Sequence, residues 1–524
     1  MFDYLIRGGS VIDGSGREAF SADVALKDGK IAAIGHNLGE AAQTVDAAGC
    51  CVTPGFLDIH RHGDAEVFRD GFGALELKQG LTGIVNGACG LSLAPFGKAH
   101  RDELLRYLRP VTGSLDSTIP TESMGAYLQA LNRRPLPLNV GMMVGGGTVR
   151  TDAFGYTAQE PEDLRPLHRS LEWALGEGAL AVSLGLGYAP ECFYSTEGLI
   201  RALAPLKNSA VPICVHMREE GDMVCQAIEE MLTVARALNC PLHISHLKAM
   251  GMRNWNKRIP RALEIMENAR QEGMEVSCDV YLYEAGSTQL LHLLPPDFLE
   301  GGVEAICARL RQKEQRELLK ERIRNGHDFD NIAQMIGWDN IILSTLHREE
   351  FVPLIGKTVA EAAEILRLDP VDCISLLLAE ENCAVTMIDR INCEEDIRRI
   401  LKAPFSSVIS DATYPTSGLP HPRVYATYPR LIEKYVLQER VLSLPEAIQK
   451  ITSLPAKTMR LKRKGLLQVG MDADLNIFKP EALHEKATFL QPRQLSEGMD
   501  YVFVAGKPAI FEGELTAHCG GTVL

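Results

Sequence analysis

Six residues at the ends of apolar runs of this chain have side chains of the kinds that bind divalent metals. They are His60, His62, Cys89, His216, His246 and Asp411. Imidazole nitrogen, thiolate sulfur and carboxylate oxygen are the donors from which zinc sites are built. His60 and His62 are separated by one residue, so in a strand both imidazoles point to the same side. Zinc held by such residues makes water reactive near neutral pH and polarises a carbonyl group, which indicates metal-assisted hydrolysis.

Each of these residues taken alone has a simpler explanation. A lone buried histidine is usually a hydrogen-bonded core residue, and a lone cysteine after a strand usually packs as a small apolar side chain. The conjunction favours a metal site, because the six residues end five different apolar runs of the sequence.

Eight short apolar runs alternate with helical patterns in the central part of the chain, which is typical of parallel strands buried on both faces. The runs are TPGFLDIH, TGIVNGAC, PLNVGMMVG, ALAVSLGLG, VPICVH, PLHISH, EVSCDVYLY and SSVISD. Eight strand–helix units predict an α/β fold, a TIM-like (β/α)8 barrel over residues 55–463. Catalytic groups of such barrels project from the carboxyl ends of the strands, where the six metal-binding residues stand.

The two ends of the chain have a different pattern, with short alternating runs broken by Gly and Asp. Residues 1–54 and 464–524 are therefore predicted to form one small β domain, a β-sandwich or β-barrel. The stretch from about 290 to 400 is too long for an ordinary connection between strands, and its helical patterns predict an inserted lid.

Composition restricts the class of partner. The 524 residues carry a formal net charge of −14, so a nucleic acid or an anionic membrane is not expected, and a small-molecule substrate is. The sequence has no apolar stretch of membrane-spanning length, and its start does not resemble a secretory leader. We expect a cytoplasmic protein whose thirteen cysteines are mostly reduced packing residues. The sequence does not indicate the number of subunits, and a homo-oligomer is one of the alternatives.

Several segments resemble a known family. PGFLDIHRHGD resembles the opening strand of the amidohydrolase superfamily. The segments that narrow the resemblance to the N-acyl-D-amino-acid deacylase (D-aminoacylase) family are VNGACGLSLAPFG, HMREEGD, ISHLKAMG, DVYLYEAGST, GWDN, HPRVYATYPR and KITSLPAKTMRL. The resemblance covers nearly the whole chain and is more specific for the family than for the substrate. It implies zinc-dependent hydrolysis of N-acyl-D-amino acids to a carboxylate and a D-amino acid.

The resemblance also implies roles for the metal-binding residues. His60 and His62 match the pair of a weaker metal site, so one or two zinc ions are implied. The tightly held zinc would take Cys89, His216 and His246. Many superfamily members bridge two metals with a carboxylated lysine on the fourth strand, but the fourth run here, ALAVSLGLG, has no lysine. Cys89 is the natural substitute for that bridge.

Asp411 resembles the catalytic base of the family. Its carboxylate can take a proton from the attacking zinc-bound water and pass it to the amide nitrogen as the C–N bond breaks. An amine leaves poorly unless it is protonated, so both halves of this proton transfer are needed.

Four residues are predicted to bind the substrate. Lys248 lies two residues past His246, so we expect it on the same face, where it would anchor the α-carboxylate. Tyr188 and Tyr283 resemble family residues that add hydroxyl contacts. Arg423 follows the last run and either binds substrate or closes a loop.

Three further residues bear on the site. His421 has the same two alternatives as Arg423. Asp58 is expected to orient a metal ligand rather than to bind metal. Gly146 departs from the family, which usually has histidine there; its loss could open the acyl pocket, alter the chiral preference or shift the preferred side chain.

Two other functions compete with deacylation. A hydrolase of cyclic amides, such as a hydantoinase or a dihydropyrimidinase, would use the same barrel, but the missing lysine of the fourth run argues against it. A non-catalytic scaffold derived from such an enzyme would not keep a costly cluster of polar groups at the rim.

Overall fold

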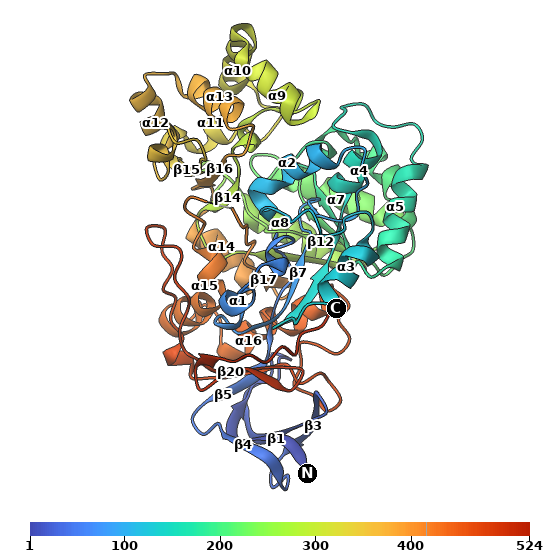
Figure 1. Cartoon of the computed structure of the whole chain (residues 1–524), viewed down its shortest axis with the longest axis vertical. Coiled ribbons are helices and arrows are strands. Elements are labelled where there is room, and N and C mark those ends of the chain that lie inside the picture. The colour runs from blue at the N-terminus through green and yellow to red at the C-terminus, as the bar shows by residue number, and fades with distance from the viewer. Residues whose placement is uncertain (416) are drawn as a thin grey trace.

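The computed structural model describes residues 1–415 and 417–524 of the chain. Figure 1 shows three regions along the long axis: a sheet at the lower end, a body of alternating strands and helices, and a group of helices at the upper end. The body holds the eight predicted runs, so it is the part that positions the candidate site.

Nine short parallel strands form the centre of the body. They are β6 (Phe56–Asp58), β7 (Leu81–Asn86), β8 (Asn139–Met142), β9 (Val144–Gly145), β10 (Val182–Gly185), β11 (Ile213–His216), β12 (Leu242–Ile244), β13 (Val276–Val280) and β17 (Ser406–Val408). They pair in the order β6-β7-β8 and β9-β10-β11-β12-β13-β17. Only Met143 separates β8 from β9, so these two are one interrupted strand, and each predicted run contains a strand.

The first and last strands continue side by side beyond their sheets. The backbone N–H of Asp411 donates to the carbonyl of His60 at 3.1 Å, and that of His62 donates to the carbonyl of Ala412 at 2.9 Å. Arg61 and Ala412 form a parallel bridge at the same place. The segments after β6 and β17 therefore lie next to each other, with their metal-binding residues at one edge.

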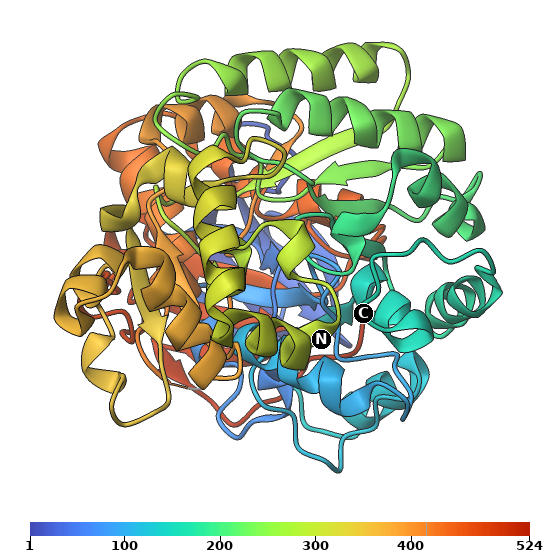
Figure 2. The ribbon, with the colours of Figure 1, turned by 90° about the horizontal axis from the view of Figure 1, so that it is seen from above.

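Helices surround these strands, as the view from above shows (Figure 2). The helices of the body are α1 (Ala74–Leu77), α2 (Arg101–Thr112), α3 (Met124–Asn132), α4 (Gly146–Phe154), α5 (Arg165–Gly176), α6 (Thr196–Ala202), α7 (Val224–Leu238), α8 (Arg258–Gln271), α14 (Glu394–Lys402), α15 (Arg423–Arg430), α16 (Leu444–Lys450) and α17 (Ser453–Thr458). A π-helix continues α15 over Leu431–Gln438. In α7 the apolar residues recur every three to four positions, which buries one face against the strands.

The segment between β13 and α14 forms the upper end of the molecule (Figure 1). Its helices are α9 (Gly302–Arg311), α10 (Lys313–Asn325), α11 (Ile332–Ile336), α12 (Val359–Leu366) and α13 (Pro370–Glu380). It also holds an antiparallel sheet that the sequence pattern did not predict, in the order β14-β16-β15. These strands are β14 (Gly286–Gln289), β15 (Ile341–Thr345) and β16 (Thr386–Asp389). They are short, and residues 286–289 read GSTQ, without the alternation that marks a strand.

Both ends of the chain contribute to one sheet. Its strands are β1 (Phe2–Val11), β2 (Phe20–Lys27), β3 (Lys30–Gly35), β4 (Ala41–Asp46), β5 (Cys51–Pro54), β18 (Leu475–Phe478), β19 (Met499–Val504), β20 (Lys507–Phe511) and β21 (Glu514–Leu515). The N-terminal and C-terminal strands meet where β5 pairs with β18. A separate cluster of buried apolar side chains lies on this sheet, apart from the larger core of the body.

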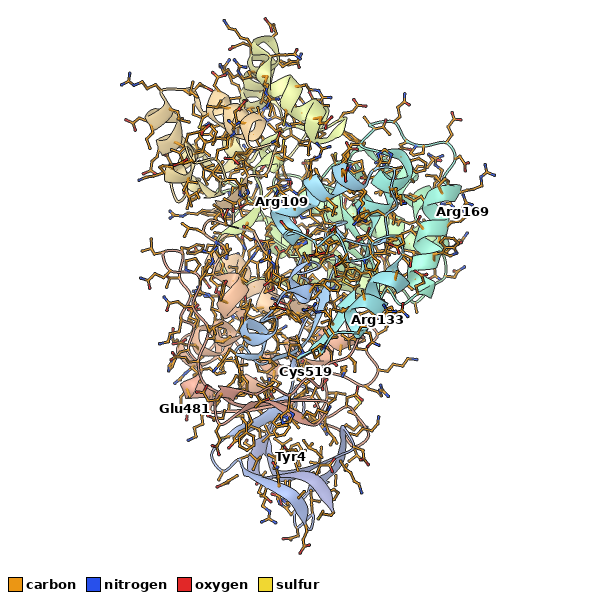
Figure 3. The ribbon with its side chains drawn as sticks, in the orientation of Figure 1. Tyr4, Arg109, Arg133, Arg169, Glu481 and Cys519 are labelled. Carbon is orange, nitrogen blue, oxygen red and sulfur yellow. The ribbon has the colours of Figure 1, made fainter. Side chains whose placement is uncertain are left out.

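Arg109, Arg133 and Arg169, which Figure 3 labels on the body, are exposed. Among the described residues, every helix is either too short or too polar to cross a bilayer.

Candidate metal centre and active site

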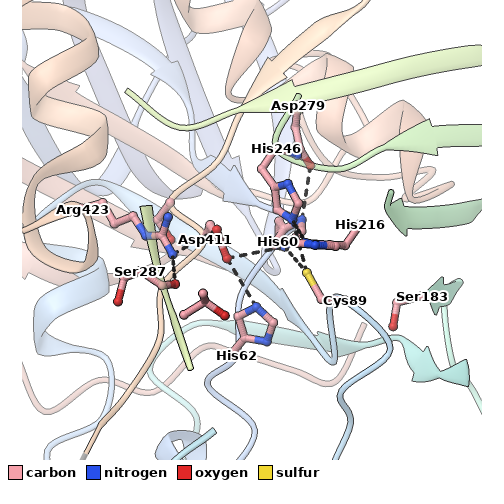
Figure 4. Close-up of polar contacts among 12 residues, drawn as sticks. His60, His62, Cys89, Ser183, His216, His246, Asp279, Ser287, Asp411 and Arg423 are labelled. Atoms are coloured by element: carbon pink, nitrogen blue, oxygen red, sulfur yellow. Dashed lines mark hydrogen bonds and ion pairs between the residues drawn. The ribbon is translucent and has the colours of Figure 1, made fainter. Parts of the chain in front are cut away.

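The six predicted metal-binding residues come together at the carboxyl ends of the strands. Their donor atoms form three overlapping groups, in each of which all atoms lie within 4.8 Å of one another. The groups are His60, His62 and Cys89; Cys89, His216 and His246; and His60, His246 and Asp411. All six side chains are buried, and Figure 4 shows them pointing toward a common centre.

Three of these residues owe their position to an uncommon backbone conformation. Cys89, His246 and Asp411 have φ angles of 54°, 35° and 49°, in the left-handed region that costs non-glycine residues energy. Each stands just after a strand, where the chain turns sharply. The turn aims the side chain across the carboxyl end of the strands instead of along them.

The distances between donor atoms fit ligands that share an ion. Cys89 Sγ lies 3.2 Å from Nε2 of His60 and 3.4 Å from Nε2 of His246. His216 Nδ1 lies 3.0 Å from His246 Nε2, and His62 Nε2 lies 3.3 Å from Asp411 Oδ1. Two ligands about 2.0–2.3 Å from a tetrahedral zinc are about 3.3–3.8 Å apart. The distances of 3.3 and 3.4 Å lie in this range, and those of 3.0 and 3.2 Å are slightly shorter, so small shifts of the side chains would let these residues hold the metal.

Electrostatics favour the charge states that metal ligands need. Burial by itself would raise the pKa of the Cys89 thiol, but the imidazoles of His60 and His246 hold that pKa well below its usual value. Burial would likewise raise the pKa of Asp411, but Arg423 and then His62 hold it well below the usual range. A thiolate and a carboxylate are thus available at the centre.

Buried carboxylates support the ligand segments from behind. Asp279 lies 3.6 Å from Nδ1 of His60 and 2.7 Å from Nε2 of His243, and it accepts a hydrogen bond from the backbone N–H of His246. Asp58 accepts from the backbone N–H of His60 at 3.3 Å and from the Ser410 hydroxyl. Asp58 therefore holds the backbone of the ligand segment and does not touch an imidazole of the cluster.

A cavity adjoins the cluster, and it brings together three of the four predicted substrate-binding residues, Lys248, Tyr188 and Arg423. Lys248 Nζ lies 2.5 Å from Glu220 Oε2, Arg423 Nη2 lies 3.0 Å from Asp411 Oδ2, and the Tyr188 and Thr288 hydroxyls are 2.9 Å apart.

Tyr283 does not line this cavity and lies at a second one. Tyr281 lines the cavity beside the cluster, where Tyr283 was expected. The ring of Tyr283 packs edge-on against His421 and lies 4.5 Å from the Arg430 guanidinium. β13 ends at Val280, so the alternation of a strand no longer fixes where Tyr283 points.

His421 closes a loop. Its Nε2 donates to the carbonyl of Ala285 at 3.0 Å, and its Nδ1 accepts from the backbone N–H of Arg423 at 3.0 Å. His421 is fully buried and does not line the cavity, whereas Arg423 does.

The space beside Gly146 is filled. A Cβ on Gly146 would collide with the Glu191 carboxylate, which accepts a hydrogen bond from the backbone N–H of Gly185 at 2.7 Å. Glu191 does not line the cavity beside the cluster. Another side chain thus occupies the space that the glycine would leave open, and the three consequences considered for Gly146 stay predictions.

Sequence reasoning missed four titratable residues that line the cavity, namely Glu220, Tyr281, His292 and Asp389. Glu220 belongs to the segment HMREEGD and follows His216 by four residues, a spacing that could have identified it. His292 and Asp389 carry no such signal, because they lie in the segment inserted after β13.

An α/β fold with imidazoles, a thiolate and a carboxylate gathered at its strand ends defines the class of metal-dependent hydrolases. The model of the Amidohydrolase family matches residues 43–510. Over its full length the chain is 32% identical to the D-aminoacylase of Alcaligenes xylosoxydans xylosoxydans and 31% identical to the N-acyl-D-aspartate deacylase of the same organism, covering 97% and 95% of them. The solved structure of N-acyl-D-glutamate deacylase from Bordetella bronchiseptica, complexed with zinc and a phosphonate inhibitor, matches with a TM-score of 0.84 and 28% identity, over 100% of this chain and 99% of that one. The chain belongs to the amidohydrolase family and, within it, to the D-aminoacylase group.

Proposed function

We propose that this protein hydrolyses the amide bond of N-acyl-D-amino acids with the help of zinc, releasing a carboxylate and a D-amino acid. The observation that carries the proposal is the convergence of Cys89, His216 and His246 on one centre beside a cavity that holds Lys248 and Arg423. Similarity to D-aminoacylase over the full chain supports the substrate class.

We also propose that the nine central strands close into a (β/α)8 barrel over residues 55–463. The backbone hydrogen bonds between the segments after β6 and β17 support closure. Residues 1–54 and 464–524 would then be the small β domain, as their shared sheet and separate apolar cluster suggest. The residues after β13 would be the insertion.

We propose that Cys89, His216 and His246 hold the tightly bound zinc and that His60 and His62 belong to a weaker site, with Asp411 beside both. A zinc ion held there acts as a Lewis acid, which lowers the pKa of water and polarises the amide carbonyl.

The protein's own groups would move the proton. Asp411 is ionised, because Arg423 stabilises its carboxylate at 3.0 Å, so it can accept a proton from the attacking water. The same carboxyl group would then donate that proton to the amide nitrogen, which makes the amine a better leaving group. Its exposed fraction is 8%, so bulk water does not compete strongly for the proton.

Lys248 and Arg423 would hold the α-carboxylate of the substrate. Both cations line the cavity, and each is already positioned by an acidic partner, Glu220 and Asp411 respectively. The Tyr188 hydroxyl, held by Thr288, would add a hydrogen bond. Tyr283 stays a prediction as a substrate contact.

Hydrolysis of cyclic amides is the second candidate. β10 reads VSLG and carries no lysine to bridge two metals, which favours deacylation. A non-catalytic scaffold is the third candidate, and the buried cluster of six donors argues against it. A cytoplasmic location and homo-oligomer formation stay predictions.

A panel of N-acetyl and N-formyl derivatives of D- and L-amino acids, scored by the amine released, tests the proposal. We expect turnover of D derivatives only, and a kcat about 10²–10⁴ lower in Asp411→Asn, with the zinc assigned to Cys89, His216 and His246 retained. Activity on cyclic ureides alone would overturn the substrate class. Near-full turnover by Asp411→Asn would overturn its role in proton transfer.

A further inference from the structure

The cavity beside the cluster contains an acidic side chain without a partner. Apart from histidines, the charged residues that line it are Lys248, Arg423, Glu220, Asp411 and Asp389. Lys248 pairs with Glu220 and Arg423 pairs with Asp411. Among the residues that the structure describes, no cation lies within ion-pair distance of Asp389, so the cavity has one carboxylate more than its own lysine and arginine can pair.

Asp389 is held at the cavity wall by the sheet of the insertion. It is the last residue of β16 and pairs with Gly286 of β14. Its exposed fraction is only 2%, and its Oδ1 has no hydrogen-bond partner among the described residues. The Tyr281 hydroxyl is equally buried and unpartnered.

Both unpartnered atoms converge on the same spot. A Cβ at Gly286 would lie 2.9 Å from Oδ1 of Asp389 and 3.3 Å from the Tyr281 oxygen. Because Gly286 has no side chain, both oxygens border the same small space at the cavity wall. A buried carboxylate left without a donor is unfavourable, so a ligand that donates hydrogen bonds or carries positive charge would be bound there.

We propose that Asp389 selects the side chain of the substrate and that the preferred substrates are N-acyl-D-amino acids whose side chains end in a cationic nitrogen, an ammonium or a guanidinium group. The inference rests on the proposed function, in which Lys248 and Arg423 take the α-carboxylate. Asp389 would then pair with the cationic end of the side chain of the same molecule.

An acidic side chain fits this cavity poorly. It would bring a second carboxylate toward Asp389, and both cations are already committed to acidic partners and to the α-carboxylate. Burial raises the pKa of Asp389 to about 6, so the group is mostly ionised at neutral pH, and a bound cation would favour that form further. The chain would thus differ in side-chain preference from a relative that acts on an N-acyl-D-aspartate.

The test compares kcat/KM for N-acetyl-D-lysine, N-acetyl-D-norleucine and N-acetyl-D-glutamate, because norleucine has the same carbon chain as lysine without the ammonium. We expect wild type to prefer the lysine derivative over norleucine by at least about 10-fold and to process glutamate least. In Asp389→Asn that preference should fall to within about 3-fold of unity, with little change for norleucine. Wild type should not prefer Nα,Nε-diacetyl-D-lysine over norleucine, because acetylation removes the charge of the side chain.

Asp372→Asn is the matched control, because it removes one negative charge from α13, where Asp372 pairs with Arg316 and Lys320 on the outside of the insertion. Its selectivity should equal that of wild type. A wild-type enzyme that handles norleucine or glutamate as well as lysine refutes the inference, and so does an Asp389→Asn variant that keeps the preference. If Asp389→Asn does not fold, the inference is tested by the substrate preference of wild type and by that of Asp389→Ser. No turnover of any N-acyl-D-amino acid refutes instead the proposed function.

Discussion

Glu220→Gln tests how the ligand geometry is maintained. Glu220 Oε1 lies 3.0 Å from Nδ1 of His246, and its Oε2 lies 2.5 Å from Nζ of Lys248. Burial would raise the pKa of Glu220, but His216, Lys248 and His246 hold it well below the usual range, so the group is a carboxylate. Lys248 Nζ lies 2.9 Å from the same Nδ1 of His246, so Glu220 positions both this ammonium group and the side of the ring opposite the metal-binding Nε2.

The magnitude follows from what the amide loses. A carboxylate behind a ligand histidine contributes about 10- to 100-fold in metal affinity, or about 1.4–2.7 kcal/mol. Glutamine keeps one acceptor for His246, but it loses the charge that faces Lys248, and the exposed fraction of Glu220 is only 1%. We therefore expect zinc affinity to fall by about 30- to 100-fold.

Competition with a zinc chelator at fixed pH measures this loss, and Glu219→Gln is the control. Glu219 is the neighbouring residue of the same loop, is half-buried and does not line the cavity. Equal zinc affinity in the two variants would refute the reasoning, because it would show that Glu220 does not set the charge or orientation of His246.

Three further predictions concern the centre and the space beside it. Cys89→Ala should retain less zinc after dialysis than wild type, and an unchanged zinc content would remove the thiolate from the ligand set. Gly146→His should unfold about 1–3 kcal/mol more easily, since the ring meets Glu191, and adding Glu191→Gly should recover most of that loss; denaturant titration of both variants decides. Burial raises the pKa of Glu191 to about 7, above the value near 4.3 of an unfolded chain, so wild type takes up protons on folding between these pH values and loses stability as the pH rises through them. Glu191→Gln has no group that titrates there, so it does not lose this stability. Its free energy of unfolding minus that of wild type should therefore be about 2–4 kcal/mol higher at pH 8 than at pH 4. If this free-energy difference does not change with pH, the assignment is contradicted.

The strands of the body could be predicted because the signal is local. A strand buried on both faces is a short apolar run, and each of the eight runs contains one. The sheet of the insertion could not be predicted in this way, because β14 is polar and pairs with β16 about a hundred residues later. Pairing at that separation leaves no local signal that identifies the partner strand.

Lys248 was placed by the argument that residues two apart in a strand share a face. Tyr283 was placed by its resemblance to a family residue that contacts the substrate. Lys248 does reach the cavity, but β12 ends at Ile244 and His246 has a φ of 35°, so a turn puts it there. After β13 the chain turns differently, and Tyr281 lines the cavity in place of Tyr283. Strand alternation therefore does not fix where a side chain points once the strand has ended.

The division between what local sequence predicts and what it does not also separates two kinds of function. The donors of the candidate metal centre stand next to the strands of the body, whereas Asp389 comes from the inserted sheet. Changes in the insertion can alter the side chain that is recognised without moving a strand that carries a metal ligand. Relatives that share the donors can therefore differ in substrate, and the substrate has to be inferred from the charge facing the cavity rather than from the ligand motifs.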